Sequence, residues 1–206
     1  MAKQARNLIG IDEVGRGPLA GPVTVCAFSV LCRGKKLPKP LHLAKDSKML
    51  SPKRREEWFK VVKELAKQNR CQYAVSCVSE KVIDREGIAY AIRLAIARSL
   101  KKIGADELRS QILLDGGIKA PAQYINQQTI IGGDRKEPII ALASIVAKVK
   151  RDSKLRRYAK IFPQYGFEIH KGYGTRLHYQ NLKKYGLSEI HRRSFLTKLL
   201  KDVRFR

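Results

Sequence analysis

The sequence predicts an α/β domain, in which β-strands alternate with α-helices. Short apolar runs, several of them rich in β-branched residues, recur along the chain and end in glycine or acidic residues, as buried strands do. Between them lie longer stretches that have apolar residues at helical spacing. The chain of 206 residues has the length of one such domain with a C-terminal extension.

Five strands are expected. The runs at 8–11, 22–31 and 111–114 are almost wholly apolar, which is typical of strands buried on both faces. The run at 72–79 alternates between apolar and polar side chains, and the run at 128–131 forms a short strand. We expect the first strand to end at the acidic residues that follow it.

Three long helices are expected between and after the strands. Ser51 followed by Pro52 is typical of an N-cap and the first helical position, so a helix is predicted from there to about Gln68. Residues 79–103 have helical spacing and are interpreted as one helix. A further helix with an Ala-rich first half is predicted over 138–161, and the rest of the chain is expected to form short helices.

The chain is strongly basic, with 43 Lys and Arg against 18 Asp and Glu and a net charge of +25. This excess favours a polyanionic partner, either nucleic acid or an anionic membrane surface. No apolar run reaches about 18 residues and no signal-peptide pattern is present, so no membrane association is expected. About half of the excess lies in 148–206, which makes this segment a candidate for following a phosphate backbone, although a solvated helix face has the same composition.

The cysteines predict a reducing environment. None of the four belongs to a C-x-x-C pair or lies near a histidine at zinc-finger spacing. We therefore expect reduced cysteines in the core of a cytoplasmic protein rather than a zinc site or disulfides. The four residues are Cys26, Cys32, Cys71 and Cys77.

Acidic residues follow three of the predicted strands, each with glycine close by. Asp12 and Glu13 follow the first strand, Asp115 follows the fourth, and Asp134 comes shortly after the fifth. Strand ends of an α/β sheet border the crevice in which ligands bind. Each acid by itself could equally be a turn or N-cap residue. Two adjacent acids between a buried strand and the turn 15–18 are a stronger sign of a site.

Grouped carboxylates favour metal-dependent chemistry. They repel one another strongly unless protons or cations intervene. Oxygen ligands select hard cations such as Mg²⁺ or Mn²⁺ rather than zinc. Two such ions, about 4 Å apart, can activate a water and stabilise the leaving oxygen of a phosphodiester. A basic surface with an acidic pocket is thus typical of a nuclease.

The segment 9–23, with the sequence IGIDEVGRGPLAGPV, closely resembles the signature opening of the bacterial type 2 ribonucleases H, or ribonuclease HII. Further blocks match this family in the expected order along the chain: 46–50, 113–116, 133–134, 143–152, 171–175 with His178, and 191–195. The resemblance therefore covers essentially the whole chain. It implies a ribonuclease H-like fold, with a central mixed five-stranded sheet flanked by helices, as a single catalytic domain on which a basic helical segment from about 160 to 206 packs.

The resemblance also implies an activity. Family enzymes cleave the RNA strand of RNA/DNA hybrids and incise 5′ of single ribonucleotides in duplex DNA, leaving 3′-hydroxyl and 5′-phosphate ends. Their four acidic metal ligands correspond here to Asp12, Glu13, Asp115 and Asp134, which would hold two divalent ions, Mg²⁺ or Mn²⁺.

Ribose recognition in the family belongs to a Gly-Arg-Gly turn and a tyrosine, which correspond to Gly15, Arg16, Gly17 and Tyr173. Glycines allow a backbone to approach a sugar closely, and an arginine can bind a phosphate with paired donors. The tyrosine ring could stack on the following deoxyribose, although a half-buried packing role is the alternative.

Five further positions carry separate expectations. Lys48 and Lys148 resemble family positions that contact phosphate. Asp152 is a fifth acid, and we expect it to pair with a basic neighbour on its helix rather than bind metal. Gly132 departs from the family, which has a lysine there, as does Leu142, which replaces a smaller residue.

Three alternatives remain at this point. The chain could be a basic nucleic-acid-binding protein without activity, a type 3 ribonuclease H, or a nuclease of the same fold that acts on another substrate such as a DNA junction. The intact Gly15–Gly17 turn and the short segment before the first strand argue against type 3. We expect a cytoplasmic monomer, and a sliding-clamp partner cannot be read from the sequence.

Overall fold

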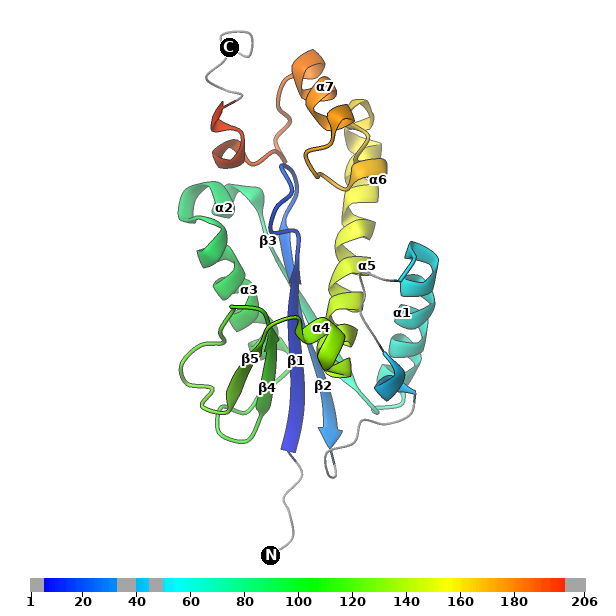
Figure 1. Cartoon of the computed structure of the whole chain (residues 1–206), viewed down its shortest axis with the longest axis vertical. Helices are drawn as coiled ribbons and strands as arrows, with labels where there is room; N and C mark the ends of the chain where they lie inside the picture. The colour runs from blue at the N-terminus through cyan, green and yellow to red at the C-terminus, as the bar shows by residue number, and fades with distance from the viewer. Residues whose placement is uncertain (1–5, 33–39, 45–49, 199–206) are drawn as a thin grey trace, which may run out of the picture.

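The central element is a mixed five-stranded sheet, as predicted, in the order β3-β2-β1-β4-β5 (Figure 1). The computed structural model describes residues 6–32, 40–44 and 50–198. β1 pairs antiparallel with β2 and parallel with β4, whereas β3 joins antiparallel and β5 parallel at the two edges. The strands are β1 (Arg6–Val14), β2 (Val23–Cys32), β3 (Gln72–Val78), β4 (Gln111–Asp115) and β5 (Gln127–Ile130).

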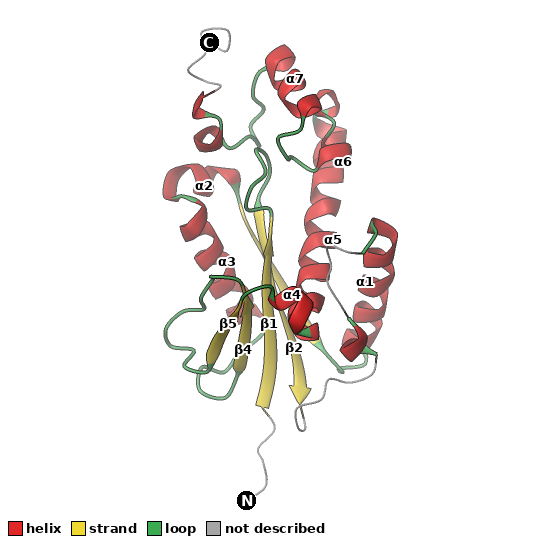
Figure 2. Ribbon diagram, viewed as in Figure 1, coloured by secondary structure: helices red, strands yellow, loops and turns green. Residues whose placement is uncertain are grey.

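Helices cover both faces of this sheet. Figure 2 shows α1 and α5 on one side and α2 and α3 on the other. The helices are α1 (Pro52–Lys67), α2 (Glu80–Glu86), α3 (Ile88–Lys102), α4 (Gly133–Lys136), α5 (Pro138–Ile161), α6 (Phe167–His170) and α7 (Arg176–Tyr185), with 3-10 turns η1 (Leu41–Leu43), η2 (Pro163–Tyr165) and η3 (Arg193–Phe195).

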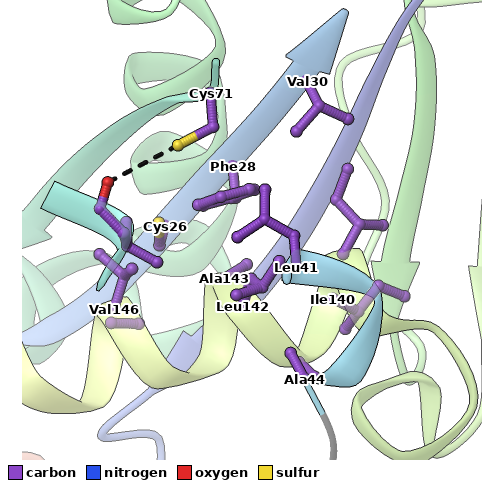
Figure 3. Packing of buried hydrophobic residues seen from close by; sticks show 14 of the residues in the cluster. Cys26, Phe28, Val30, Leu41, Ala44, Cys71, Ile140, Leu142, Ala143 and Val146 are labelled. Carbon is purple, nitrogen blue, oxygen red and sulfur yellow. Dashed lines mark hydrogen bonds between the residues drawn. The ribbon is translucent and has the colours of Figure 1, made fainter. Parts of the chain in front are cut away.

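Two hydrophobic clusters result from the alternation of side chains along the strands. In β2, Cys26 and Phe28 pack toward α1 and α5, whereas Val25 and Ala27 pack toward α3. Figure 3 shows the first cluster, in which β2 and the buried start of α5 meet. Gly10 on β1 permits this close packing, because a Cβ there would lie 2.4 Å from the carbonyl oxygen of Ile139.

Two boundaries differ from the prediction. Residues 79–103 form two helices, because Gly87 adopts a φ of +82° between α2 and α3. β1 does not end before its acids but continues to Val14. The cause is β2, which pairs with Asp12 and Glu13 after the parallel partner β4 has reached its last pairing at Ile11.

The C-terminal elements pack at the far end of α5. Leu155 of α5 contacts a third cluster, which includes Leu19 from the β1–β2 loop and Phe167 from α6. The predicted short helices are thus present as η2, α6, α7 and η3. None of the described helices is both long and apolar enough to cross a membrane.

The predicted core position is confirmed for two of the cysteines. Cys26 and Cys71 are buried free thiols, and the Cys71 thiol donates to the Val62 carbonyl at 3.7 Å (Figure 3). Cys77 is also free but exposed; it lies near the end of the edge strand β3, with its Sγ 3.4 Å from Oγ1 of Thr24. The side chain of Cys32 lies outside the described residues.

Candidate active site

Three of the four predicted acids face one pocket, here called the acidic pocket. Asp12 and Glu13 reach it from β1 and Asp115 from the end of β4. The parallel register pairs Ile11 with Leu114, so Asp12 and Asp115 come next to each other at the same end of the sheet. The acidic pocket has a volume of about 270 Å³ and is lined by Asp12, Glu13, Val14, Gly15, Arg16, Gly17, Arg55, Asp115, Ser144, Lys148 and Tyr173.

Asp134, the fourth predicted acid, comes from α4, which is hydrogen-bonded to the end of β4. It lies on α4 rather than in a loop and is 1% exposed, and it is not one of the described residues that line the pocket. Its neighbour Gly133 donates its backbone N–H to Oδ1 of Asp115 at 2.7 Å, which ties α4 to the end of β4. Gly132 precedes α4 with φ +64° and ψ +37°, a left-handed conformation that explains a glycine in place of the lysine expected there.

Asp12 is the deeply buried acid of the pocket and is 4% exposed. Burial raises the pKa of Asp12 to about 8, and the negative charges of Glu13 and Asp115 raise it further. A hydrogen bond from Ser144 and one from the backbone N–H of Glu13, at 2.8 Å, oppose this rise. The ionised carboxylate is therefore costly in this position unless a cation lies beside it.

The donor atoms of the pocket fit a hard divalent cation. Its acids offer carboxylate oxygens, and no histidine or cysteine is among the described residues that line it. Repulsion among Asp12, Glu13 and Asp115 would be relieved by such an ion. The carboxylates do not yet have the spacing of a metal site, since the described residues contain no group of three acids, histidines or cysteines close enough together to hold a metal ion.

The Gly-Arg-Gly turn forms the rim of the pocket, and its two glycines differ. Gly15 is buried with a φ of +90°, and a Cβ there would lie 2.2 Å from Nε of Arg151. Gly17 is exposed, and a Cβ there would meet nothing within 4 Å. Between them the exposed Arg16 places its guanidinium 3.9 Å from Oε1 of Glu13. Gly15 is thus required by the protein's own packing, and only Gly17 leaves space for a ligand.

Arg192 holds the turn from beneath. It is fully buried and donates to the carbonyl oxygens of Gly15 at 2.6 Å, Arg16 at 3.0 Å and Gly21 at 2.9 Å. Burial lowers the pKa of Arg192 to about 10, and the nearby charge of Arg151 contributes. The guanidinium keeps its charge at neutral pH and satisfies three carbonyl groups with its fixed fork of donors.

Arg151 joins this turn to the loop that carries Tyr173. It is also fully buried and donates to the carbonyls of Pro22 at 3.1 Å, Ala20 at 3.2 Å and Lys171 at 3.0 Å. A backbone hydrogen bond of 2.8 Å from Leu19 to Gly172 connects the same two loops. Sequence reasoning missed both arginines, because nothing in a chain with 43 basic residues marks the two that are buried.

Tyr173 and Lys148 also line the pocket. The Tyr173 residue is 42% exposed, which fits both a half-buried packing role and contact with a substrate. Nζ of Lys148 lies 6.0 Å from the centre of this ring and 2.9 Å from Oδ1 of Asp152. The predicted pairing of Asp152 with a basic neighbour is therefore confirmed. Lys48 lies outside the described residues.

Arg55 is a further pocket residue that was not predicted. It lies on the first turn of α1 and lines the acidic pocket, and its Nη1 donates to the Leu50 carbonyl at 2.6 Å. Its neighbour Arg54 instead points to solvent, 73% exposed, and pairs with Glu57. Helical spacing alone could not separate these two arginines without knowing which side of α1 faces the sheet.

Known proteins resemble this chain in sequence and fold. The family model of ribonuclease HII matches residues 9–198. Curated ribonuclease HII proteins from Endomicrobium trichonymphae and Alkaliphilus metalliredigens are 46% and 45% identical to this chain, over 90% and 95% of it and 83% and 92% of their own lengths. The ribonuclease HII of Archaeoglobus fulgidus, solved in complex with PCNA, superposes with a TM-score of 0.69 at 25% identity, covering 90% of this chain and 93% of that one.

These matches correspond to the type 2 enzymes, so the type 3 and the non-enzymatic alternatives are wrong. The predicted ribonuclease H-like fold is confirmed. The chain therefore belongs to the ribonuclease HII family and is a ribonuclease H.

Proposed function

We propose that this ribonuclease H incises duplex DNA on the 5′ side of single ribonucleotides as well as cutting the RNA strand of hybrids, with two divalent ions. The products would carry 3′-hydroxyl and 5′-phosphate ends. The observation that supports this most strongly is the convergence of Asp12, Glu13 and Asp115 in one pocket whose rim is formed by Gly15–Gly17 and Tyr173. Chemistry and the choice of cleavage position would then share one pocket.

The acids would hold the ions. Asp12 and Asp115 meet at the ends of adjacent strands, Glu13 follows on β1, and Asp134 is brought close by the hydrogen bond from Gly133 to Asp115. Mg²⁺ or Mn²⁺ bound there would lower the pKa of an attacking water and stabilise charge on the phosphate. The protein contributes a buried Asp12 that gains strongly from a cation and a Ser144 hydroxyl that orients this carboxyl.

The rim would recognise the ribose. Gly17 has open space around it, so its backbone can come close to a sugar that carries a 2′-hydroxyl. The exposed ring of Tyr173 would stack on the next sugar, where a second hydroxyl would be excluded. Arg16 would exchange its contact with Glu13 for a phosphate of the substrate.

Basic residues around the pocket would hold the duplex. Lys148 and Arg55 line the pocket and would contact phosphates beside the cleavage position. We place Lys48 in the same role from its position in the motif. We further propose that the chain acts as one catalytic domain and as a monomer in the cytoplasm, in the repair of DNA that contains ribonucleotides. The Archaeoglobus complex makes a clamp of the PCNA kind a partner to test by co-purification.

One experiment tests the substrate and the site together. A labelled DNA duplex with a single ribonucleotide is incubated with the protein and Mg²⁺ or Mn²⁺, beside an RNA/DNA hybrid and an all-DNA duplex of the same sequence. We expect one nick 5′ of the ribonucleotide, loss of cleavage in Asp12→Asn, and full activity in the control Glu64→Gln on the exposed face of α1. Equal cutting of the all-DNA duplex would contradict the proposed specificity, and activity in Asp12→Asn would contradict the proposed site.

A further inference from the structure

Three buried histidines lie beneath the loop that carries Tyr173. His170 ends α6, His178 lies on α7, and His191 precedes η3; they are 7%, 0% and 3% exposed. The rings of His170 and His178 are stacked with their centres 4.3 Å apart, and His191 lies 5.2 Å from His178. None of them lines the acidic pocket as described, so the proposed mechanism leaves them without a role.

The hydrogen bonds of these histidines run in one direction. The backbone N–H of Ser188 donates to Nδ1 of His191 at 2.9 Å, so in a neutral ring Nε2 of His191 carries the proton. Nε2 of His191 lies 3.0 Å from Nε2 of His178, which must therefore accept. The proton of His178 is then on Nδ1, which donates to the carbonyl oxygen of Tyr173 at 2.9 Å.

The third histidine is fixed in the same way. The backbone N–H of Gly172 donates to Nδ1 of His170 at 3.1 Å, so Nε2 of His170 donates to the Tyr165 carbonyl at 2.7 Å. An additional proton on Nε2 of His178 would place two N–H groups against each other across 3.0 Å, and one on Nδ1 of His191 would oppose the Ser188 N–H across 2.9 Å. Burial also lowers the pKa of all three rings, which agrees with neutral forms at physiological pH.

The backbone position of Tyr173 depends on the hydrogen bonds of these histidines. Its loop passes through two residues with left-handed backbone, Lys171 at φ +52° and Gly172 at φ +83°. Beyond them the Tyr173 carbonyl accepts from the Thr175 N–H at 2.8 Å and from His178. The His178 bond is the one that links this carbonyl to the buried layer, while the residue remains 42% exposed beside the pocket.

We propose that His178 and His191 are positioning residues, which hold Tyr173 in place for the discrimination of single ribonucleotides through a hydrogen-bond chain of fixed direction. This inference rests on the function proposed for Tyr173. Neither histidine lines the acidic pocket. Their loss should therefore reduce the preference for single ribonucleotides more than the rate of cleavage itself.

The direction of the chain is measured first, in the unaltered protein. Long-range ¹H–¹⁵N correlation spectra at pH 7 distinguish the two neutral tautomers and the charged form of each histidine. We expect the Nδ1–H form for His178 and the Nε2–H form for His170 and His191, with the exposed His42 as an internal reference. A charged His178, or one protonated on Nε2, would overturn the proposal whatever the activity.

The second measurement compares kcat/KM on the single-ribonucleotide duplex with kcat/KM on a long hybrid. His178→Phe keeps a ring but removes the donor, and we expect its single-ribonucleotide to hybrid ratio to fall by about tenfold, as for one lost hydrogen bond of about 1.4 kcal/mol. His178→Asn retains an N–H near the position of Nδ1 and should recover most of the ratio. His42→Phe, at an exposed histidine, should leave the ratio unchanged.

The outcomes separate the two levels of the argument. A ratio that changes in Tyr173→Ala but not in His178→Phe would refute the positioning role alone. A ratio that changes in neither would refute the role of Tyr173 and with it the positioning role, while incision 5′ of the ribonucleotide by the unaltered protein still tests the proposed function. Equal losses on both substrates in His178→Phe would reduce the histidines to ordinary packing. If that variant does not fold, His178→Asn and the tautomers of the unaltered protein still decide.

Discussion

Replacing Gly15 by alanine tests whether this glycine serves the protein's own packing. The φ of +90° would cost an L-residue about 1–2 kcal/mol. The new Cβ would also lie 2.2 Å from Nε and 2.8 Å from Cδ of Arg151, so the guanidinium must move and lose its bond to the Pro22 carbonyl. A hydrogen bond from a charged donor contributes about 1.5–3 kcal/mol, so the total loss in unfolding free energy should be about 2.5–5 kcal/mol.

Urea denaturation followed by fluorescence of Trp58, the single tryptophan, measures this loss. Gly17→Ala is the matched control, because a Cβ at Gly17 meets nothing within 4 Å; its unfolding free energy should change by less than about 0.5 kcal/mol. Because Gly17 is proposed to approach the ribose, the Gly17→Ala variant should remain stable but cleave single ribonucleotides poorly. A Gly15→Ala protein as stable as the unaltered chain would refute the packing argument, as would equal losses in both variants.

Three further outcomes are expected. Arg55→Ala should weaken hybrid binding and reduce the slope of log K against log salt by about 0.9, as for one lost phosphate contact. The control Arg54→Ala should change the slope little. Equal slopes in the two variants would contradict a contact between Arg55 and the substrate. Burial lowers the pKa of His178 and His191 to about 4, so the unfolded state binds protons first as pH falls below 6.5. The unfolding free energy should therefore fall from pH 6.5 toward pH 4. The charges of Glu168 and Lys171 affect the pKa of the neighbouring His170. The urea midpoint should fall less with pH in His178→Phe than in the unaltered protein. Chelation should abolish cleavage, and added Mg²⁺ should raise the Tm of the unaltered protein more than that of Asp12→Asn; equal shifts would place the ion elsewhere.

The elements that could be predicted are those whose signals are local. Ser51 and Pro52 mark the start of α1, and the Ser51 side chain does accept from the Arg54 N–H. The bounds predicted for α5, 138–161, are the observed ones. Gly87 was missed because helical apolar spacing continues on both sides of it, and only its φ of +82° shows the break.

The acids illustrate what local patterns leave out. Charged residues at 12 and 13 suggest the end of a strand, yet β2 pairs with both and keeps them in β1. That Asp12 and Asp115 meet depends on the register between β1 and β4, which the sequence of neither strand contains. The burial of Arg151 and Arg192 likewise follows from carbonyl groups that other segments bring to them.

Arg192 has a consequence for how the enzyme is made. Gly15 and the side chain that binds its carbonyl are 177 residues apart, so the ribosome must add nearly the whole described chain before this bond can form. Until then the carbonyl groups of Gly15, Arg16 and Gly21 in the β1–β2 loop lack their buried donor. A nascent chain that has already paired β1 with β2 thus carries its acidic residues beside an unfinished rim until Arg192 has been added.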